Sequence, residues 1–395
     1  MATVLLLCWR DTTHPQGGGA EHYLETMGEA LAAAGHSVFY RTAHYSGAAR
    51  REQVKGMTLS RGGGRITVYP RALAAIVAAR FGKGPLADMG VPDIIVDTQN
   101  GVPFFARLVT RAPVVVLEHH CHREQWPVAG PGLAQLGWFL ESTVSPWVHR
   151  HCQYITVSEP SKAELMELGV DGDRITVIPN GCDPIPADVP VRAPKPDGDT
   201  RVDAPRPASP IRLVTLSRLV PHKQIEHAIH ALHQLLPIYP QLHLDIVGDG
   251  WWRPQLHRYV RQLEHTSGMD LHPHITFHGY VTEEQKHRIL ASADVHLMPS
   301  RKEGWGLAVM EAAQHQVPTI GYAEARGLKQ SIRHNQTGLL VADVAELVTA
   351  TAALIADPAR RHSLGRAAER YADQYHWEAS AERFLSRIAP ASVTA

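Results

Sequence analysis

Residues 295–312 read VHLMPSRKEGWGLAVMEA, and this stretch indicates the fold most clearly. A short apolar run, Val295–Met298, leads into a polar loop in which glycines flank Trp305, and a helix-like segment follows. A buried strand, a glycine loop and a helix in this order are typical of the βαβ units of parallel sheets. Glu303 falls in the loop, and Glu311 is expected about two turns into the helix.

The same rhythm of strand and helix recurs on both sides of this stretch. Before it, the predicted strands are 4–8, 37–40, 93–97, 113–117, 154–158, 174–178, 211–216, 242–247 and 275–278, and 318–321 follows it. Between the first two strands, the helix predicted over 22–34 ends before Gly35. Such alternation predicts an α/β fold with mainly parallel sheets.

A break in composition divides the chain. The segment 184–210 is rich in Pro, Asp, Arg and Ala and poor in large apolar residues, so it is expected to be an extended linker. We predict an N-terminal Rossmann-like domain over 1–183, a C-terminal one over 211–375 and a final helix over 376–395 that crosses back to the first domain. The two doubly wound domains are expected to face each other across a cleft.

Composition narrows the class of function. The 395 residues are 44% hydrophobic, which is ample for two cores, and 39 basic residues balance 39 acidic ones. A nucleic-acid-binding protein would need a basic excess, so no nucleic-acid partner is expected. The N-terminus has no basic region of a secretory signal and no apolar stretch is long enough to cross a membrane, so we expect a cytoplasmic protein with four reduced cysteines.

Charged residues follow a second predicted strand of the C-terminal half. Arg218 and Lys223 come just after the strand 211–216 and before a helix. Cations at the carboxyl end of a parallel strand lie where α/β proteins bind ligands, and an arginine fork suits a diphosphate. Two solvated surface cations are the alternative.

Glycine loops and acids complete the candidate site. Gly17–Gly19 follow the first strand and open a helix, a position that favours contact of Gly18 and Gly19 with a phosphate or sugar. A plain tight turn is the alternative. Backbone amides over Gly304, Trp305, Gly306 and Leu307 are further donors to a phosphate or sugar oxygen. An acid such as Glu311 can accept hydrogen bonds from ribose hydroxyls.

These segments together resemble the retaining glycosyltransferases of family 4, which have the GT-B fold, over nearly the whole chain. Glu303 and Glu311 match the E-x7-E pattern of that family, and Ser217-Arg218 with Lys223 resembles its diphosphate-binding segment. Further resembling blocks are Gly18-Gly19-Ala20-Glu21, Val247-Gly248-Asp249-Gly250, Phe277-His278-Gly279-Tyr280-Val281 and Thr337-Gly338-Leu339-Leu340-Val341. Gln224 stands where the family commonly has glycine, and Trp305 where phenylalanine is commoner.

The resemblance implies a function and roles for these residues. A hexose-type sugar would pass from a nucleoside-diphosphate sugar to an acceptor hydroxyl with retention of anomeric configuration and without a metal or other cofactor. Arg218 and Lys223 would neutralise the diphosphate, Glu311 would hold the ribose, and Glu303 would bind the sugar near its anomeric carbon. Gly248, Tyr280 and Val281 would lie at the donor, the last two beside the base.

A histidine cluster, Glu118-His119-His120-Cys121-His122, follows the strand 113–117. The family often has a functional histidine here; His119 matches its position best and His120 second. Asn100 and Trp126 are further candidates for contact with the sugar or acceptor, and a structural role for the histidines is the plain alternative. A metal site built on His120 and His122 would need ligands from elsewhere, none of which is evident.

Other functions stay open. A nucleotide-sugar epimerase or hydrolase on the same fold, a metal-dependent hydrolase using His120 and His122, and a non-catalytic sugar-binding relative are the alternatives. The acceptor is expected to be a glycan, a lipid-linked sugar or a small molecule. The sequence does not identify which of these it is, nor the base and sugar of the donor, nor the oligomeric state. A basic amphipathic stretch over 71–83 fits either a solvated helix packed on the domain or contact with an anionic membrane.

Overall fold

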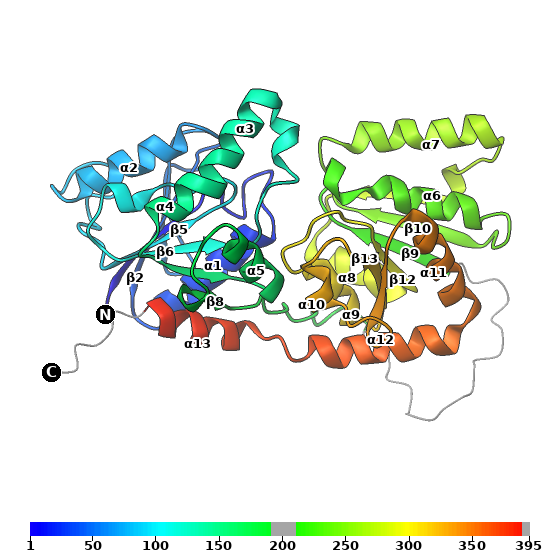
Figure 1. Cartoon of the computed structure of the whole chain (residues 1–395). Coiled ribbons are helices and arrows are strands. Elements are labelled where there is room, and N and C mark those ends of the chain that lie inside the picture. Colours follow the sequence, from blue (N-terminus) through cyan, green and yellow to red (C-terminus); the bar gives the residue numbers. More distant parts are fainter. Residues whose placement is uncertain (191–210, 389–395) are drawn as a thin grey trace. The chain divides into compact units, whose positions relative to one another are not determined.

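Short runs of branched and aliphatic residues form the strands, and nearly all of these strands lie in two parallel sheets (Figure 1). The computed structural model of the chain describes residues 1–190 and 211–388. The chain forms two compact units, one of 1–181 with 376–395 and one of 182–375. We treat each unit by itself.

Unit 1 holds an eight-stranded sheet in the order β3-β4-β2-β1-β5-β6-β7-β8. All its strand pairs are parallel except β3 with β4. Its strands are β1 (Thr3–Leu7), β2 (Ser37–Thr42), β3 (Arg51–Val54), β4 (Met57–Arg61), β5 (Ile94–Thr98), β6 (Val114–Glu118), β7 (Gln153–Thr156) and β8 (Ile175–Val177). The hairpin of β3 and β4 was not predicted from the sequence.

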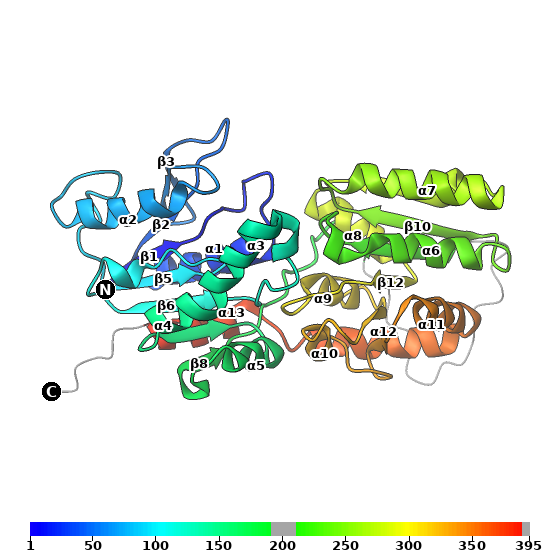
Figure 2. The same cartoon turned by 45° about the horizontal axis from the view of Figure 1, so that its top comes forward.

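The helices of unit 1 are α1 (Gly19–Ala33), α2 (Val68–Ala79), α3 (Pro131–Phe139), α4 (Ser145–Val148), α5 (Glu159–Glu167) and α13 (Trp377–Ile388). Short 3-10 turns lie at Ala106–Leu108, Trp126–Ala129 and Gly172–Arg174, and a π-helical turn lies at Leu140–Val144. Apolar residues of α2 share a buried cluster with Phe39 of β2, and Figure 2 shows α2 beside that strand.

The last helix of the chain, α13, packs on the first. The Trp377 ring meets the rings of His22 and Tyr23 at centroid distances of 5.4 and 5.9 Å, and the Ser380 hydroxyl donates to the Pro179 carbonyl at 2.7 Å. Gly181 lets the chain pass close to the Trp377 backbone, where a Cβ would collide. Unit 1 therefore contains both the first and the last described elements of the chain.

Unit 2 holds a six-stranded, fully parallel sheet in the order β11-β10-β9-β12-β13-β14. Its strands are β9 (Ile211–Leu216), β10 (Leu242–Val247), β11 (Ile275–Gly279), β12 (Val295–Met298), β13 (Thr319–Tyr322) and β14 (Gly338–Val341). Its helices are α6 (Ile225–Leu235), α7 (Arg253–Ser267), α8 (Glu283–Ser292), α9 (Leu307–Ala313), α10 (Leu328–Ser331), α11 (Val344–Ala356) and α12 (Pro358–Ala372), with 3-10 turns at Pro221–Lys223 and His272–His274.

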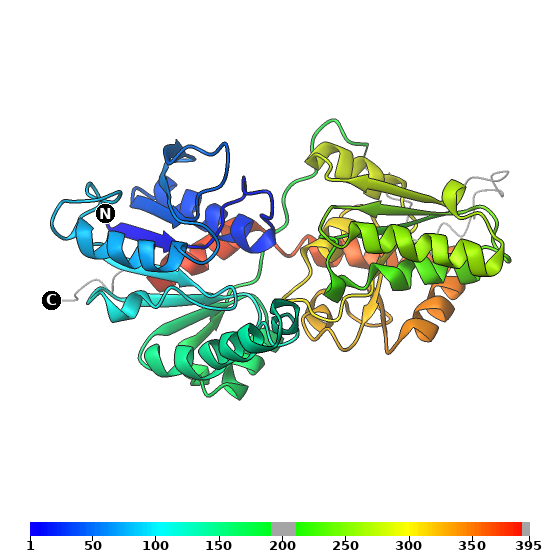
Figure 3. The ribbon, with the colours of Figure 1, turned by 90° about the horizontal axis from the view of Figure 1, so that it is seen from above.

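Helices cover both faces of the unit 2 sheet. Apolar residues of α6, α7 and α11 share one buried cluster with the strands, and Figure 3 shows α6 and α7 lying over that face. Residues of α8 and α9 pack with Val214 and Val247 in a second cluster. Because both faces are covered, ligands can reach the backbone only at the ends of the strands.

The segment expected as a linker begins on unit 2. The Asp183 carbonyl accepts a hydrogen bond from the Gln314 side chain at 2.7 Å, and Asp188 pairs with Arg288 at 3.1 Å. Val189 is buried. Residues 191–210, which make up the rest of the expected linker, lie outside the described residues.

Candidate active site

The strand order of unit 2 marks one place for a ligand. Successive strands run outward from β9 through β10 to β11 on one side, and from β12 through β13 to β14 on the other. The loops after β9 and β12 therefore lead to helices on opposite faces of the sheet, and the strand ends between them are where open α/β sheets bind ligands. The segments 217–224 and 299–306, singled out from the sequence, are these two loops.

Lys223 and Glu303 join the two loops. The Lys223 ammonium forms an ion pair with the Glu303 carboxylate, and their side chains are only 12% and 10% exposed. A backbone hydrogen bond of 2.8 Å from Arg301 to His222 ties the same loops together. The pair thus places a buried cation and a buried carboxylate at the point where the strand order reverses.

The loop that carries Glu303 is held by glycines. Gly306 has φ +91°, a left-handed conformation that favours glycine. A Cβ on Gly327 would collide with the carbonyl oxygens of Glu303 and Gly304, so the loop rests directly on the Gly327 backbone. The position of the Glu303 carboxylate therefore depends on close backbone packing.

Trp305 turns inward from this loop. Its side chain is buried and meets the Tyr375 ring edge-on at 5.0 Å. The indole nitrogen has no hydrogen-bond partner within the described residues. The predicted contact of Trp305 with the sugar donor stays a prediction, and it would be made by the backbone of Trp305 rather than by its buried side chain.

Glu311 lies nearer the start of its helix than the sequence predicts. Because α9 begins at Leu307, Glu311 is the fifth of seven helical residues, about one turn in rather than two. The Leu307 side chain is half-buried at the first position. Two turns would need a helix that begins near Gly304, which belongs to the loop instead.

The sequence reasoning missed Lys286, the partner of Glu311. Its ammonium lies 2.6 Å from a Glu311 oxygen and 2.5 Å from a Glu283 oxygen, on a side chain that is 10% exposed. Burial alone would lower the pKa of this ammonium, but Glu311 and Glu283 raise the pKa above its usual value. The signal in the sequence is the capping box of Thr282 and Gln285, which fixes where α8 begins.

The ends of β10 and β11 approach each other beside the loop after β9. The Gly248 amide donates to the Gly279 carbonyl at 2.9 Å, and a Cβ on Gly248 would overlap the Ser217 carbonyl oxygen. Packing of strand ends therefore already requires glycine at 248. Tyr280, which follows, is 90% exposed, whereas Val281 packs partly into the core.

Gln224 adopts a backbone conformation that favours glycine, the residue that the family resemblance leads us to expect here. It has φ +49° and precedes the first residue of α6, directly after the turn that carries Lys223. A left-handed conformation costs a non-glycine residue about 1–2 kcal/mol. Arg218, in the same loop, has an exposed side chain.

In unit 1, the predicted glycine loop is closed by a buried carboxylate. Glu21 accepts a hydrogen bond from the Gly18 amide at 2.8 Å and pairs with Arg10 at 2.9 Å. Helix α1 begins at Gly19, earlier than the predicted 22. The loop follows β1, whose neighbours β2 and β5 lead in opposite directions through the sheet, so it lies at the corresponding reversal of strand order.

His119 lies at the carboxyl end of β6 and is buried. Its ring meets the Tyr23 ring edge-on at 5.2 Å, and neither ring nitrogen has a hydrogen-bond partner within the described residues. Burial, and then the neighbouring His122, lowers the pKa of His119 to about 3. The ring is therefore neutral at physiological pH.

The remaining predicted contacts of unit 1 are engaged in local structure. The His120 ring stacks on His122 at 4.6 Å, and Trp126 donates its indole N–H to Glu141 at 2.5 Å. Asn100 donates to the Cys8 sulfur at 3.6 Å. Their roles toward a sugar or acceptor stay predictions.

The alternative of a metal site built on His120 and His122 does not match the group of potential metal ligands that the structure brings together. In the described part of the chain, that group is Glu118, Cys121 and Glu141, whose atoms lie within 4.8 Å of one another. Both carboxylates of the group already accept hydrogen bonds, that of Glu118 from Gln99 and that of Glu141 from Trp126. The arrangement gives no support to a hydrolase built on the two histidines.

Comparison with known proteins agrees with this architecture. The family model described as Glycosyl transferases group 1 matches residues 198–371, and the one described as Glycosyltransferase Family 4 matches residues 17–185. The chain is a glycosyltransferase of the family 4 type. Its two α/β units form the two halves of the GT-B fold.

Individual proteins are similar to this chain over nearly its whole length. The glycosyltransferase is 27% identical over 401 residues, 95% of each chain, to a GDP-mannose-dependent alpha-(1-6)-phosphatidylinositol monomannoside mannosyltransferase of Mycolicibacterium smegmatis. Among solved structures, sucrose-phosphate synthase of Thermosynechococcus elongatus aligns with TM-score 0.76 and 23% identity over 97% of each chain. WaaG, a glycosyltransferase involved in lipopolysaccharide biosynthesis, aligns with TM-score 0.70 and 15% identity, covering 98% of the glycosyltransferase and 99% of WaaG.

No helix in the described part of the glycosyltransferase is long and apolar enough to span a bilayer.

Proposed function

We propose that the glycosyltransferase moves a hexose from a nucleoside-diphosphate sugar to an acceptor hydroxyl, with retention of anomeric configuration and without a bound metal. The observation that carries this proposal is the ion pair of Lys223 and Glu303 at the reversal of strand order in unit 2. A cation there suits the diphosphate, and a carboxylate beside it suits the sugar.

Under this proposal, the diphosphate, the ribose and the base of the sugar donor each contact residues of unit 2. Lys223 and Arg218 neutralise the diphosphate, so the diphosphate competes with Glu303 for the Lys223 ammonium. Glu311 accepts hydrogen bonds from the ribose, since a carboxylate offers about four lone-pair positions and Lys286 uses one of them. Gly248, Tyr280 and Val281 lie on the side of the base, and the backbone of 304–307 contacts the phosphate or sugar.

The relatives suggest which donor and acceptor to test first. Those with the fullest alignments are called GDP-mannose-dependent mannosyltransferases of phosphatidylinositol monomannoside. We therefore propose GDP-mannose as donor and a mannosylated phospholipid as acceptor, bound by unit 1 with His119 or His120 at the sugar.

Charge stabilisation supplies the chemistry in this proposal. The bond from the anomeric carbon to the diphosphate oxygen breaks, the acceptor oxygen bonds to the same carbon, and the acceptor proton passes to the leaving diphosphate. Lys223 and Arg218 lower the barrier by stabilising the negative charge that develops on that leaving group. His119 is neutral, so its ring can form a hydrogen bond without adding charge.

Contact with a membrane surface fits a lipid acceptor. In unit 1, Val77 and Phe81 are exposed apolar residues at the end of α2, and Arg80 and Lys83 lie close to them in the sequence. We propose a cytoplasmic enzyme held at the membrane by this surface. Sedimentation with anionic liposomes at low salt checks this, and absence of binding contradicts it.

A transfer assay tests the proposed reaction. The full chain is incubated with GDP-mannose, phosphatidylinositol monomannoside and a metal chelator, and the anomeric configuration of the new linkage is read by NMR. We expect a product with the configuration of the donor, formed in the presence of chelator. An inverted product, or loss of activity to the chelator that added metal restores, contradicts the mechanism. Free mannose without acceptor would indicate a hydrolase.

A further inference from the structure

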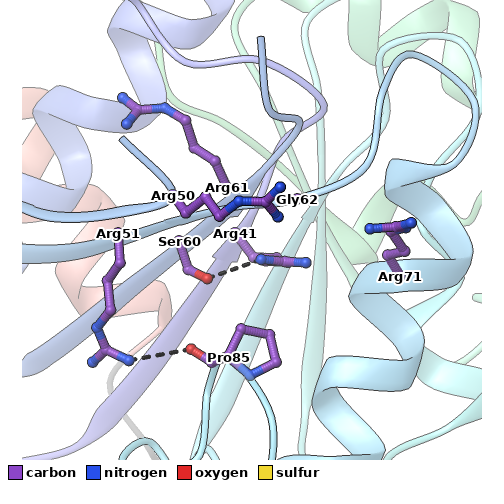
Figure 4. Close-up of a pocket in the computed structure, with 8 residues that line it drawn as sticks. All are labelled: Arg41, Arg50, Arg51, Ser60, Arg61, Gly62, Arg71 and Pro85. Carbon is purple, nitrogen blue, oxygen red and sulfur yellow. Dashed lines mark hydrogen bonds between the residues drawn. The ribbon is translucent and has the colours of Figure 1, made fainter. Parts of the chain in front are cut away.

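A pocket rich in arginine lies at the edge of unit 1, at the carboxyl ends of β2 and β4. It has a volume of about 260 Å³, and five arginines line it, Arg41, Arg50, Arg51, Arg61 and Arg71 (Figure 4). They come from three strands, the approach to β3 and helix α2. Like charges repel, so such a gathering calls for compensating negative charge.

Two of the five guanidinium groups have such compensation within the protein. Arg61 pairs with Asp11 at 2.6 Å and also with Glu52. Arg51 pairs with Asp88 and donates to the Pro85 carbonyl at 3.2 Å, as Figure 4 shows in part. These two arginines shape the pocket but bring little net charge to it.

Arg41 is buried, and it forms no ion pair with a carboxylate in the described part of the chain. Its guanidinium donates to the Ser60 hydroxyl at 2.9 Å, and its buried Nε has no hydrogen-bond partner within the described residues. Gly62 makes room for it, because a Cβ there would lie 2.5 Å from a terminal nitrogen of Arg41. Burial, and then the nearby Arg71, lowers the pKa of Arg41 to about 10, so it is still charged at neutral pH.

The other two arginines reach the pocket from the surface. Arg50 and Arg71 are exposed, and neither forms an ion pair among the residues that the structure describes. Together with Arg41 they leave three positive charges around one hollow. Burying an uncompensated guanidinium such as Arg41 costs stability unless a ligand supplies the opposite charge.

We propose that this pocket binds the phosphate group of a phosphorylated acceptor. Guanidinium groups that enter from different directions match the several oxygens of a tetrahedral dianion, whereas a carboxylate presents two oxygens in one plane. Arg61 also donates to Thr13 at 3.2 Å and pairs with Asp11, so the pocket wall is joined to the loop between β1 and α1. The assignment to an acceptor rests on the proposed glycosyltransferase reaction, whereas phosphate binding itself does not.

Calorimetry with the full chain tests the site. The probes are inorganic phosphate, glycerol 3-phosphate, and vesicles of phosphatidylcholine with or without phosphatidylinositol, all at matched ionic strength. Loss of one charge-assisted contact weakens binding by about tenfold to a hundredfold. We expect that loss for Arg71→Gln and Arg50→Gln, and a smaller loss for Gly62→Ala, which crowds Arg41 while keeping every charge.

Arg65→Gln is the matched control, because Arg65 is an exposed arginine of the same region that does not line the pocket. Phosphate binding that Arg71→Gln weakens and Arg65→Gln leaves unchanged supports the site. If only phosphatidylinositol vesicles bind in this way, the phosphate belongs to a lipid headgroup; if the soluble probes do so as well, it belongs to a soluble ester.

Absence of binding by every probe overturns the proposal. So does equal weakening by Arg65→Gln, which would indicate diffuse charge. GDP-mannose binding is measured on the same variants and is expected to be unchanged, because none of the substituted residues is a proposed donor contact and the proposed diphosphate and ribose contacts, Lys223, Arg218 and Glu311, lie in unit 2. Phosphate binding without any GDP-mannose binding would refute the proposed reaction but support the phosphate pocket. GDP-mannose binding without phosphate binding would support the proposed donor site but refute the phosphate pocket.

Discussion

Replacing Lys286 by methionine removes the cation that holds Glu311. The variant keeps most of the side-chain volume but leaves the Glu311 carboxylate, which is 22% exposed, without its 2.6 Å partner. Breaking a fully buried ion pair costs about 3–5 kcal/mol, and partial exposure reduces this, so we expect a loss of about 2–3 kcal/mol in the free energy of unfolding of unit 2. The bond to the exposed Glu283 adds about 0.5 kcal/mol at most.

The same variant has a second, functional readout. Lys286 is a positioning residue, because it fixes the carboxylate that we propose holds the ribose. Without it we expect donor affinity to fall by about tenfold, corresponding to about 1.4 kcal/mol. Urea unfolding followed by circular dichroism gives the stability, and calorimetry with GDP-mannose gives the affinity.

The pH dependence of the loss provides an internal check. The folded-state pKa of Lys286 is raised, so its stabilisation is fully present below the ordinary lysine pKa of about 10.4 and is lost as the pH rises through the folded-state pKa. The difference in the free energy of unfolding between wild type and Lys286→Met should therefore become smaller only above about pH 10.4. In addition, Glu311→Gln combined with Lys286→Met should cost less than the sum of the single changes. If Lys286→Met lowers the free energy of unfolding by less than about 0.5 kcal/mol, the ion pair does not stabilise unit 2 as described. Additive losses for Lys286→Met and Glu311→Gln would equally contradict a coupling between the two residues.

Three further changes test the structure around both halves of the site. His119→Asn should reduce the acid sensitivity, because the depressed pKa of about 3 makes the folded state lose about 2–3 kcal/mol between neutral pH and pH 4.5, which pH-dependent urea unfolding measures. Gln224→Gly should raise the melting temperature slightly, since relief of the left-handed strain, about 1–2 kcal/mol, exceeds the entropy cost of glycine, about 0.5–1 kcal/mol. Gly327→Ala should displace the loop at Glu303 and weaken GDP-mannose binding by about tenfold, as read by calorimetry.

Each of these three has an outcome that contradicts it. An unchanged acid profile for His119→Asn would mean that other buried groups, such as His296 with its pKa lowered to about 3, dominate. A lower melting temperature for Gln224→Gly would show that the Gln224 side chain contributes contacts outweighing the strain. Wild-type affinity in Gly327→Ala would show that the loop adapts.

Much of the fold could be predicted because buried parallel strands are short apolar runs bounded by polar or glycine residues. The predicted strands 211–216, 242–247 and 295–298 coincide with β9, β10 and β12, and α13 forms residues 377–388 of the final segment predicted over 376–395. The hairpin of β3 and β4 escaped because its turn is Lys55-Gly56, with φ of +50° and +79°, rather than the commoner Asn-Gly or Asp-Gly.

The candidate site was predictable only as separate segments. The sequence placed Lys223 and Glu303 after two strands, but their ion pair depends on the strand order, which no local pattern contains. Lys286 could not be connected with Glu311, because that contact is made between two helices, α8 and α9. The burial of His119 is likewise a tertiary effect, since the run of histidines around it reads as polar.

The most direct test of the central claim is the dissociation constant of GDP-mannose for wild type and for Lys223→Ala, measured by calorimetry with Lys329→Ala as control. Lys329 is an exposed lysine of unit 2, on α10, so its removal changes the net charge equally. We predict that wild type and Lys329→Ala bind alike and that Lys223→Ala binds about tenfold to a hundredfold more weakly. Equal affinity of all three proteins would contradict the assignment of the diphosphate to the loop after β9.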